Sequence, residues 1–134
     1  MELPYDWRPE YSVGNKTLDS QHQKLLQICK RVSVYRCDGT RTSISHFHTI
    51  LNDLASYAAT HFETEERVLH RIGYPSLLQQ NIEHKEYSER LVDFLCAAID
   101  GRIDREALEE FLWKWWVSHI LESDMQYASY IGKP

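Results

Sequence analysis

The chain has 134 residues, of which 43% are hydrophobic and 26% charged, and its formal net charge is -5 with histidine neutral. This balance is typical of a single globular domain with one sizeable core, so we expect residues 1–134 to form one domain. An acidic chain without a lysine and arginine cluster argues against nucleic acid or an anionic membrane as its main partner. No apolar run is long enough to span a membrane, and the N-terminus lacks the apolar core of a signal peptide.

The three cysteines, Cys29, Cys37 and Cys96, are odd in number and have no CxxC spacing. We expect them to be small buried apolar residues of a reduced, cytoplasmic protein. Seven histidines and 20 acidic residues, in contrast, supply ample donors for a metal site.

Turn signals at 37–40, 73–75 and 100–102 divide the chain into four segments, each with apolar residues at helical spacing. The expected helices cover about 18–35, 43–72, 76–99 and 105–130. Thr17 or Asp19 is a plausible N-cap for the first helix. Short connections between four helices predict an all-α protein, an antiparallel up-down four-helix bundle. We expect Tyr5, Trp7 and Tyr11 to form an N-terminal aromatic arm that packs on it.

Each apolar helix face is interrupted by histidine, carboxylate or amide side chains. These are His22 in the first helix, His61 and Glu65 in the second, Gln80 and His84 in the third, and His119 and Asp124 in the fourth. The pairs in the second and third helices are spaced i, i+4, so their members point the same way. His119 and Asp124 are five residues apart, so they converge only if the helix loosens or ends near Ser123.

A single histidine on an apolar face is usually a hydrogen-bonded core residue. Four imidazoles and two carboxylates at similar depth are harder to explain, because burying them without a cation leaves unpaired charge and polar groups. Imidazole with carboxylate favours iron, manganese or zinc. Two carboxylates that can bridge, with the nitrogens divided around them, suit a pair of metal ions better than one.

Four stretches of the chain resemble the bacterial hemerythrins: WRPEYSVGNKTLDSQHQKL, HFETEERVLHRIGYP, the EH at 83–84, and WWVSHILESDMQYA. The resemblance covers essentially the whole chain, and the HFxxEE, GYP and HIxxxD elements occur in family order and spacing. It implies a four-helix bundle that holds a non-haem di-iron centre, two oxo- or hydroxo-bridged iron ions, with dioxygen and small anions as ligands.

The resemblance also implies a role for each polar residue of the bundle. His22 and His61 correspond to nitrogen ligands of the iron that takes dioxygen, Glu65 and Asp124 to bridging carboxylates, and His84 and His119 to ligands of the second iron. The family normally gives the second iron a third histidine, and Gln80 stands at that position. Gln80 either ligates iron directly, hydrogen-bonds a water that fills the position, or takes no part.

A second departure concerns Trp115 and Trp116. The family commonly has Trp-Leu here, with the leucine over the dioxygen pocket. Trp116 either fills core space or lines that pocket, where its ring would narrow the space or its indole N–H would donate a hydrogen bond.

The remaining polar residues near these positions are not expected to bind metal. They are His46, His48 and His70, together with Glu66, which should face away from the site. Asp19 and Glu83 either support the neighbouring ligand histidines or face solvent, and we favour solvent.

The favoured function is a dioxygen-binding module that acts as an oxygen or redox sensor of a signalling protein, with an output domain or signalling partner. A dioxygen carrier or store is the alternative, followed by a di-iron peroxidase, an NO-handling enzyme or an iron reservoir. No separate general acid or nucleophile adjoins the site in sequence, so we do not expect an enzyme.

Overall fold

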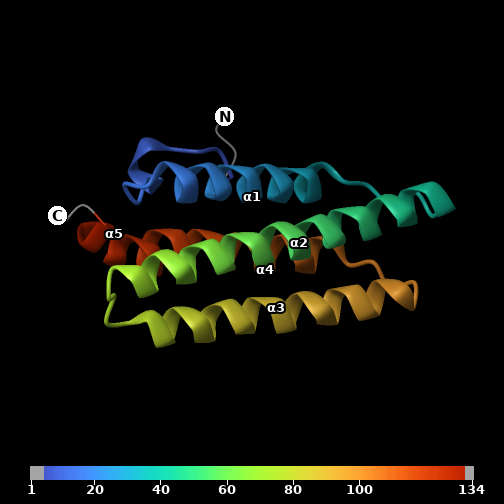
Figure 1. Ribbon diagram of the computed structural model, residues 1–134. Helices are drawn as coiled ribbons and strands as arrows, with labels where there is room; N and C mark the ends of the chain where they lie inside the picture. Colours follow the sequence, from blue (N-terminus) through green and yellow to red (C-terminus); the bar gives the residue numbers. More distant parts are fainter. Residues whose placement is uncertain (1–4, 132–134) are drawn as a thin grey trace.

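Four antiparallel helical rods account for most of the chain (Figure 1), which the computed structural model describes for residues 5–131. The elements are η1 (Pro9–Tyr11), α1 (Lys16–Val34), α2 (Arg41–Arg71), α3 (Leu77–Ile99), α4 (Arg105–Ser118), η2 (His119–Asp124) and α5 (Met125–Ile131). The fourth rod is continuous, because the π-helical segment η2 joins α4 to α5. The predicted all-α, up-down four-helix bundle is confirmed, with helix boundaries within two residues of those expected.

The start of α1 differs from the sequence prediction. Asn15 is the N-cap, and its side chain accepts a hydrogen bond from the Leu18 amide. Asp19, predicted as a cap or a solvent-facing charge, instead accepts hydrogen bonds from the Val13 amide at 2.9 Å and the Ser12 hydroxyl at 2.6 Å. Asp19 therefore fixes the segment that leads into the helix.

A tight reversal between α2 and α3 sets the relative position of these two helices. Gly73 has a φ of 68°, a left-handed conformation that glycine adopts without steric cost. The amide of Gly73 donates to the His70 carbonyl and that of Tyr74 to the Leu69 carbonyl. These bonds satisfy carbonyls at the end of α2 and turn the chain directly into α3.

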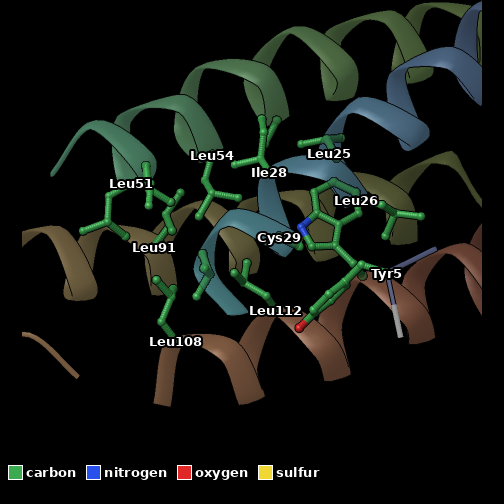
Figure 2. Close-up of a cluster of buried hydrophobic side chains, with 14 of the residues drawn as sticks. Tyr5, Leu25, Leu26, Ile28, Cys29, Leu51, Leu54, Leu91, Leu108 and Leu112 are labelled. Carbon is green, nitrogen blue, oxygen red and sulfur yellow. The ribbon is translucent and has the colours of Figure 1, made fainter. Parts of the chain in front are cut away.

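Two hydrophobic clusters fill the bundle. The larger one contains leucines from every long helix (Figure 2). The smaller one contains Val13, Leu18, Leu69, Tyr74 and Tyr127. Along each rod the buried polar residues lie between members of the two clusters, so apolar packing encloses them from both directions.

The N-terminal arm packs on the bundle as predicted. Tyr5 is buried, donates a hydrogen bond to the Glu109 carbonyl and meets Trp113 edge-on at a centroid distance of 6.0 Å. Tyr11 is also buried, against the ring of Trp7.

Of the three cysteines, only Cys29 is buried as expected. Cys37 and Cys96 are exposed, so the prediction that all three are core residues is wrong. None of the helices in the described part of the chain combines the length and apolarity needed to cross a membrane.

Candidate metal centre

Three rods contribute a first group of four donors, which we call the first donor set. It consists of His22 from α1, His61 and Glu65 from α2, and Asp124 from η2, whose donor atoms lie within 4.8 Å of one another. His22 Nε2 is 3.1 Å from Asp124 Oδ2, and His61 Nε2 is 3.3 Å from Glu65 Oε2. All four side chains are fully buried.

A second donor set adjoins the first and shares Glu65. It consists of Glu65, His84 from α3 and His119 from η2. His84 Nε2 and His119 Nε2 lie 2.8 Å and 3.5 Å from Glu65 Oε1. The two oxygens of Glu65 thus face different sets. The two oxygens of Asp124 are divided in the same way, because Oδ2 is near His22 of the first set and Oδ1 is 3.0 Å from His119 Nε2 of the second. Both carboxylates are placed to bridge two ions.

The π-helical segment explains how His119 and Asp124 meet. A π-helix has a wider turn than an α-helix, so side chains five residues apart share a face. His119 and Asp124 are the first and last residues of η2, and both are buried. The sequence prediction that the helix must loosen between them is confirmed.

Several buried polar atoms of the two sets and of the neighbouring Gln80 have no hydrogen-bond partner. They are both ring nitrogens of His22, Nε2 of His61, Nδ1 of His119, Oδ2 of Asp124 and Oε1 of Gln80. His22 Nε2 and Asp124 Oδ2 are close, yet neither makes a hydrogen bond of acceptable geometry. Buried polar groups are normally paired, so donors that converge without bonding to one another fit a shared cation. Imidazole and carboxylate donors suit iron.

Burial and the neighbouring carboxylates shift the pKa values of the buried histidines in opposite directions. Burial lowers the pKa of His22, but Asp124 and Glu65 outweigh it and raise the pKa to about 9. Burial likewise opposes protonation of His119, whose pKa is nevertheless raised well above its usual range by Asp124 and Glu65. Burial dominates at His61 and lowers its pKa. Protons and metal ions therefore compete for the same imidazole lone pairs.

Outer partners hold two of the imidazoles in place. Gln21 Oε1 lies 2.8 Å from Nδ1 of His61, and Glu66 Oε2 lies 2.7 Å from Nδ1 of His84. Such partners fix the ring orientation of a ligating histidine. The expectation that Glu66 faces away is wrong, because this flank of α2 packs against α3.

Of the two alternatives for Glu83, the favoured one, a solvent-facing charge, is wrong. It accepts a 2.6 Å hydrogen bond from the Ser123 hydroxyl, and its Oε1 is 3.9 Å from Nδ1 of His119. Glu83 thereby links α3 to the π segment beside the second donor set.

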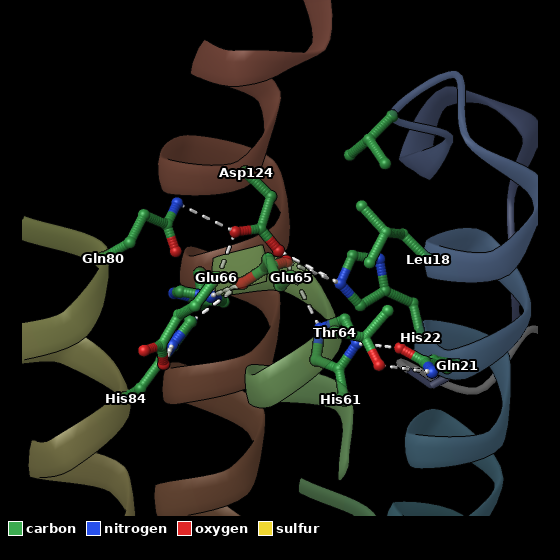
Figure 3. A network of polar contacts seen from close by, with 12 residues as sticks. Leu18, Gln21, His22, His61, Thr64, Glu65, Glu66, Gln80, His84 and Asp124 are labelled. Atoms are coloured by element: carbon green, nitrogen blue, oxygen red, sulfur yellow. Dashed lines mark hydrogen bonds and ion pairs between the residues drawn. The ribbon is translucent and has the colours of Figure 1, made fainter. Parts of the chain in front are cut away.

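Gln80 is buried, with 2% of its surface exposed, and lies one helical turn before His84. Its Nε2 donates a 3.1 Å hydrogen bond to Asp124 Oδ1 (Figure 3). Its Oε1 has no partner. Three roles for Gln80 were considered from the sequence. The one in which Gln80 takes no part in the site does not fit its contact with Asp124.

Aromatic rings cover one side of the two donor sets. Phe62 stacks on His84 at 3.9 Å, Trp115 stacks on His119 at 4.4 Å, and Trp116 lies 6.1 Å from His61. We call Phe62, Trp115 and Trp116 the aromatic cover. The indole N–H of Trp116 points to the Tyr87 hydroxyl at 3.4 Å, rather than being free for a ligand.

The histidines not expected to bind metal lie outside both donor sets. His48 Nε2 contacts the Ala98 carbonyl at 3.2 Å, His46 packs on Tyr35, and His70 is exposed near the end of α2.

Known proteins similar to this chain match almost all of it. The Hemerythrin HHE cation binding domain matches residues 13–131. A bacteriohemerythrin of Clostridium acetobutylicum is 30% identical over 124 residues, covering 90% of this chain and 96% of that protein. A myohemerythrin of Riftia pachyptila is 28% identical over 124 residues, covering 92% and 91%. A crystal structure of wild-type hemerythrin has a TM-score of 0.84 at 20% identity, covering 96% of this chain and 98% of that chain.

Proposed function

Because the chain belongs to the hemerythrin family, we propose that it senses dioxygen or redox state rather than carrying dioxygen. Membership makes it a non-haem iron domain with a di-iron centre that binds dioxygen. The family is one of oxygen-binding proteins rather than enzymes, which agrees with the expectation that the chain is not an enzyme.

In this proposal the two donor sets hold one iron each. His22 and His61 would bind the first iron, His84 and His119 would bind the second, and Glu65 and Asp124 would be shared between them. The support is geometric, since each carboxylate directs one oxygen to each set. When bound, the iron pair supplies the electrons and coordination sites for dioxygen. The protein orients the ligands and excludes bulk water with the aromatic cover.

Gln80 is the observation that favours sensing. It occupies the position of the usual third histidine, so the second iron has two imidazole nitrogens, His84 and His119. An amide oxygen donates less electron density to iron than an imidazole does, and water can take the position. Such a centre should pass quickly from the oxygenated to the oxidised state, which is unfavourable for a carrier but suits a two-state switch.

The bridging residue Asp124 offers a path from the centre to the fold. It ends the π segment, and α5 begins at the next residue, Met125. A change of charge or bridging geometry at the two irons would therefore act directly on the helix that follows. An output domain or signalling partner would read this movement.

Gln80→His tests the proposal. The protein is loaded with iron(II) without oxygen, exposed to air, and followed by absorbance until the oxidised form is complete. The variant should oxidise more slowly, since it regains a third nitrogen. Gln27→His, the same change at an exposed position of α1, should oxidise like the wild type.

A wild-type protein that releases dioxygen reversibly for hours, with no change on introducing histidine, would favour the carrier or store. Turnover of hydrogen peroxide or nitric oxide with a supplied reductant would instead favour the peroxidase or NO-handling alternatives.

Metal analysis tests the ligand assignment separately. Two irons per chain are expected in the wild type, and His84→Ala should lose one of them. His70→Ala removes an exposed histidine and should keep both. A wild type that saturates at one iron would replace the paired site by a mononuclear one.

A further inference from the structure

The amide of Gln80 can have only one orientation in its present contact. Asp124 as a carboxylate only accepts hydrogen bonds, so the NH₂ group of Gln80 must face its Oδ1. The carbonyl oxygen is then left inside the protein without a partner. A buried amide oxygen that is unpaired costs free energy, which a ligand able to donate a hydrogen bond would recover.

The second donor set contains the imidazoles of His84 and His119 and the shared carboxylate of Glu65, and Asp124 Oδ1 lies 3.0 Å from His119 Nε2. Gln80 lies one turn before His84 on the same face of α3, and its hydrogen bond to Asp124 holds its amide beside this set. Figure 3 shows the amide beside Asp124, across from His22 and His61.

The surroundings of the centre differ between its two sides. On the side of Trp116 and Phe62, the aromatic cover packs against the imidazoles at the distances given above. On the other side, a pocket of about 210 Å³ reaches Gln80 from the surface between the start of α3 and the π segment. Its wall is polar and includes Glu83, Ser123 and Gln126. A small hydrophilic molecule is therefore better accommodated from this side.

We infer that the second donor set keeps an open coordination position beside Gln80 for an exchangeable ligand that donates a hydrogen bond. Water occupies it at rest, and a small protic molecule such as hydrogen peroxide has the same hydrogen-bonding chemistry. The inference rests on the proposed metal centre. It places external ligands at the metal held by His84 and His119, whereas the resemblance to hemerythrins implies the metal held by His22 and His61.

The Glu83–Ser123 hydrogen bond lies at the edge of this access path. Both residues also line a larger groove of about 520 Å³ between α3 and α4, which reaches His119. The bond therefore separates the polar pocket at Gln80 from the groove.

Manganese(II) and water are the probes for the test. Imidazole and carboxylate sites bind manganese(II), and its effect on water proton relaxation reports water bound directly to the metal and in exchange with solvent. Wild-type protein loaded with two ions per chain should show this contribution. Gln80→His should lose it, because the imidazole fills the position, while the surface control Gln27→His should retain it.

Gln80→Leu supplies a second variant that adds no donor. It should keep the directly bound water but exchange it faster, because the acceptor oxygen is gone. If Gln80→His binds two ions and its relaxation equals that of the wild type, the position is closed or the amide itself is the ligand, and the inference is wrong. Fewer than two ions in the wild type would instead refute the proposed metal pair. Ion counting therefore distinguishes failure of the metal pair from failure of the open position.

Discussion

Tyr127 and Glu65 are joined by a buried hydrogen bond of 2.7 Å between side chains 62 residues apart in the chain. The tyrosine hydroxyl donates to Oε2, the carboxylate oxygen that faces the first donor set. Burial and the charges of Asp124 and Glu65 raise the pKa of Tyr127 far above its usual value, so the hydroxyl stays a donor. This bond fixes the bridging carboxylate from the side of the smaller hydrophobic cluster.

Tyr127→Phe should destabilise the protein, because a hydrogen bond to a charged group is lost while the ring remains. The expected loss in free energy of unfolding is about 1.5–3 kcal/mol. Denaturant unfolding at neutral pH measures it. Tyr57→Phe changes a half-exposed ring elsewhere on α2 and should have little effect. Equal stability of the two variants would mean that Glu65 finds another donor.

Glu66→Ala should weaken the second metal selectively. Glu66 holds Nδ1 of His84, and the loss of such a partner lowers metal affinity by about 10–100-fold. Anaerobic titration with iron(II) should show one unchanged and one weakened binding step. Glu63→Ala, which breaks only an exposed ion pair with Arg67, should leave both steps intact. Equal weakening of both steps would contradict the assignment of His84 to one metal.

Trp116→Leu should open the aromatic cover. The cavity left by the larger ring should cost about 1–3 kcal/mol of stability. Azide should then bind the diferric protein faster in stopped-flow measurements, since a second path to the centre becomes available. Trp113→Leu, at a partly exposed position of α4, is the matched control. An unchanged association rate would show that Trp116 does not restrict access.

The chelator-treated protein should lose stability as pH rises from 6.5 to 9. The pKa of His22 is about 9 in the folded chain against an ordinary value of 6.5, so the folded state binds the proton more tightly. That contribution is complete below pH 6.5 and disappears as pH passes 9, and it amounts to roughly 3 kcal/mol.

Unfolding measurements across this range test the sign of the effect. His22→Gln should flatten the profile, and His70→Gln, at an exposed position, should not. A wild-type protein that becomes more stable towards pH 9 would contradict the raised pKa of His22 in the folded chain.

The periodicity of single helices was sufficient to predict the bundle and the convergence of His61 with Glu65. It also indicated that His119 and Asp124 need a loosened turn, which the π segment provides. These features depend on the spacing of residues along one helix, which the sequence states directly. The start of α1 was predicted wrongly, because Asn15, Thr17 and Asp19 are all capping residue types and the choice depends on tertiary contacts of the preceding segment.

Contacts between helices were harder to predict. Glu66 follows Glu65 by one residue, a rotation of about 100°, and whether that direction meets solvent or α3 depends on the neighbouring helix. Gln21 and Tyr127 were missed for the same reason. One signal for Tyr127 was available, since it lies three residues after Asp124 and so shares its helix face.

The position of Trp115 should make its fluorescence sensitive to a bound metal. Its indole stacks on His119 at 4.4 Å with an interplanar angle of 18°. An excited indole this close to a bound transition metal loses its energy by transfer to the metal, so filling of the second donor set should quench its emission. Trp113, on the partly exposed face of α4, should remain bright. The chain thus contains its own fluorescent reporter of metal occupancy, one that requires no label.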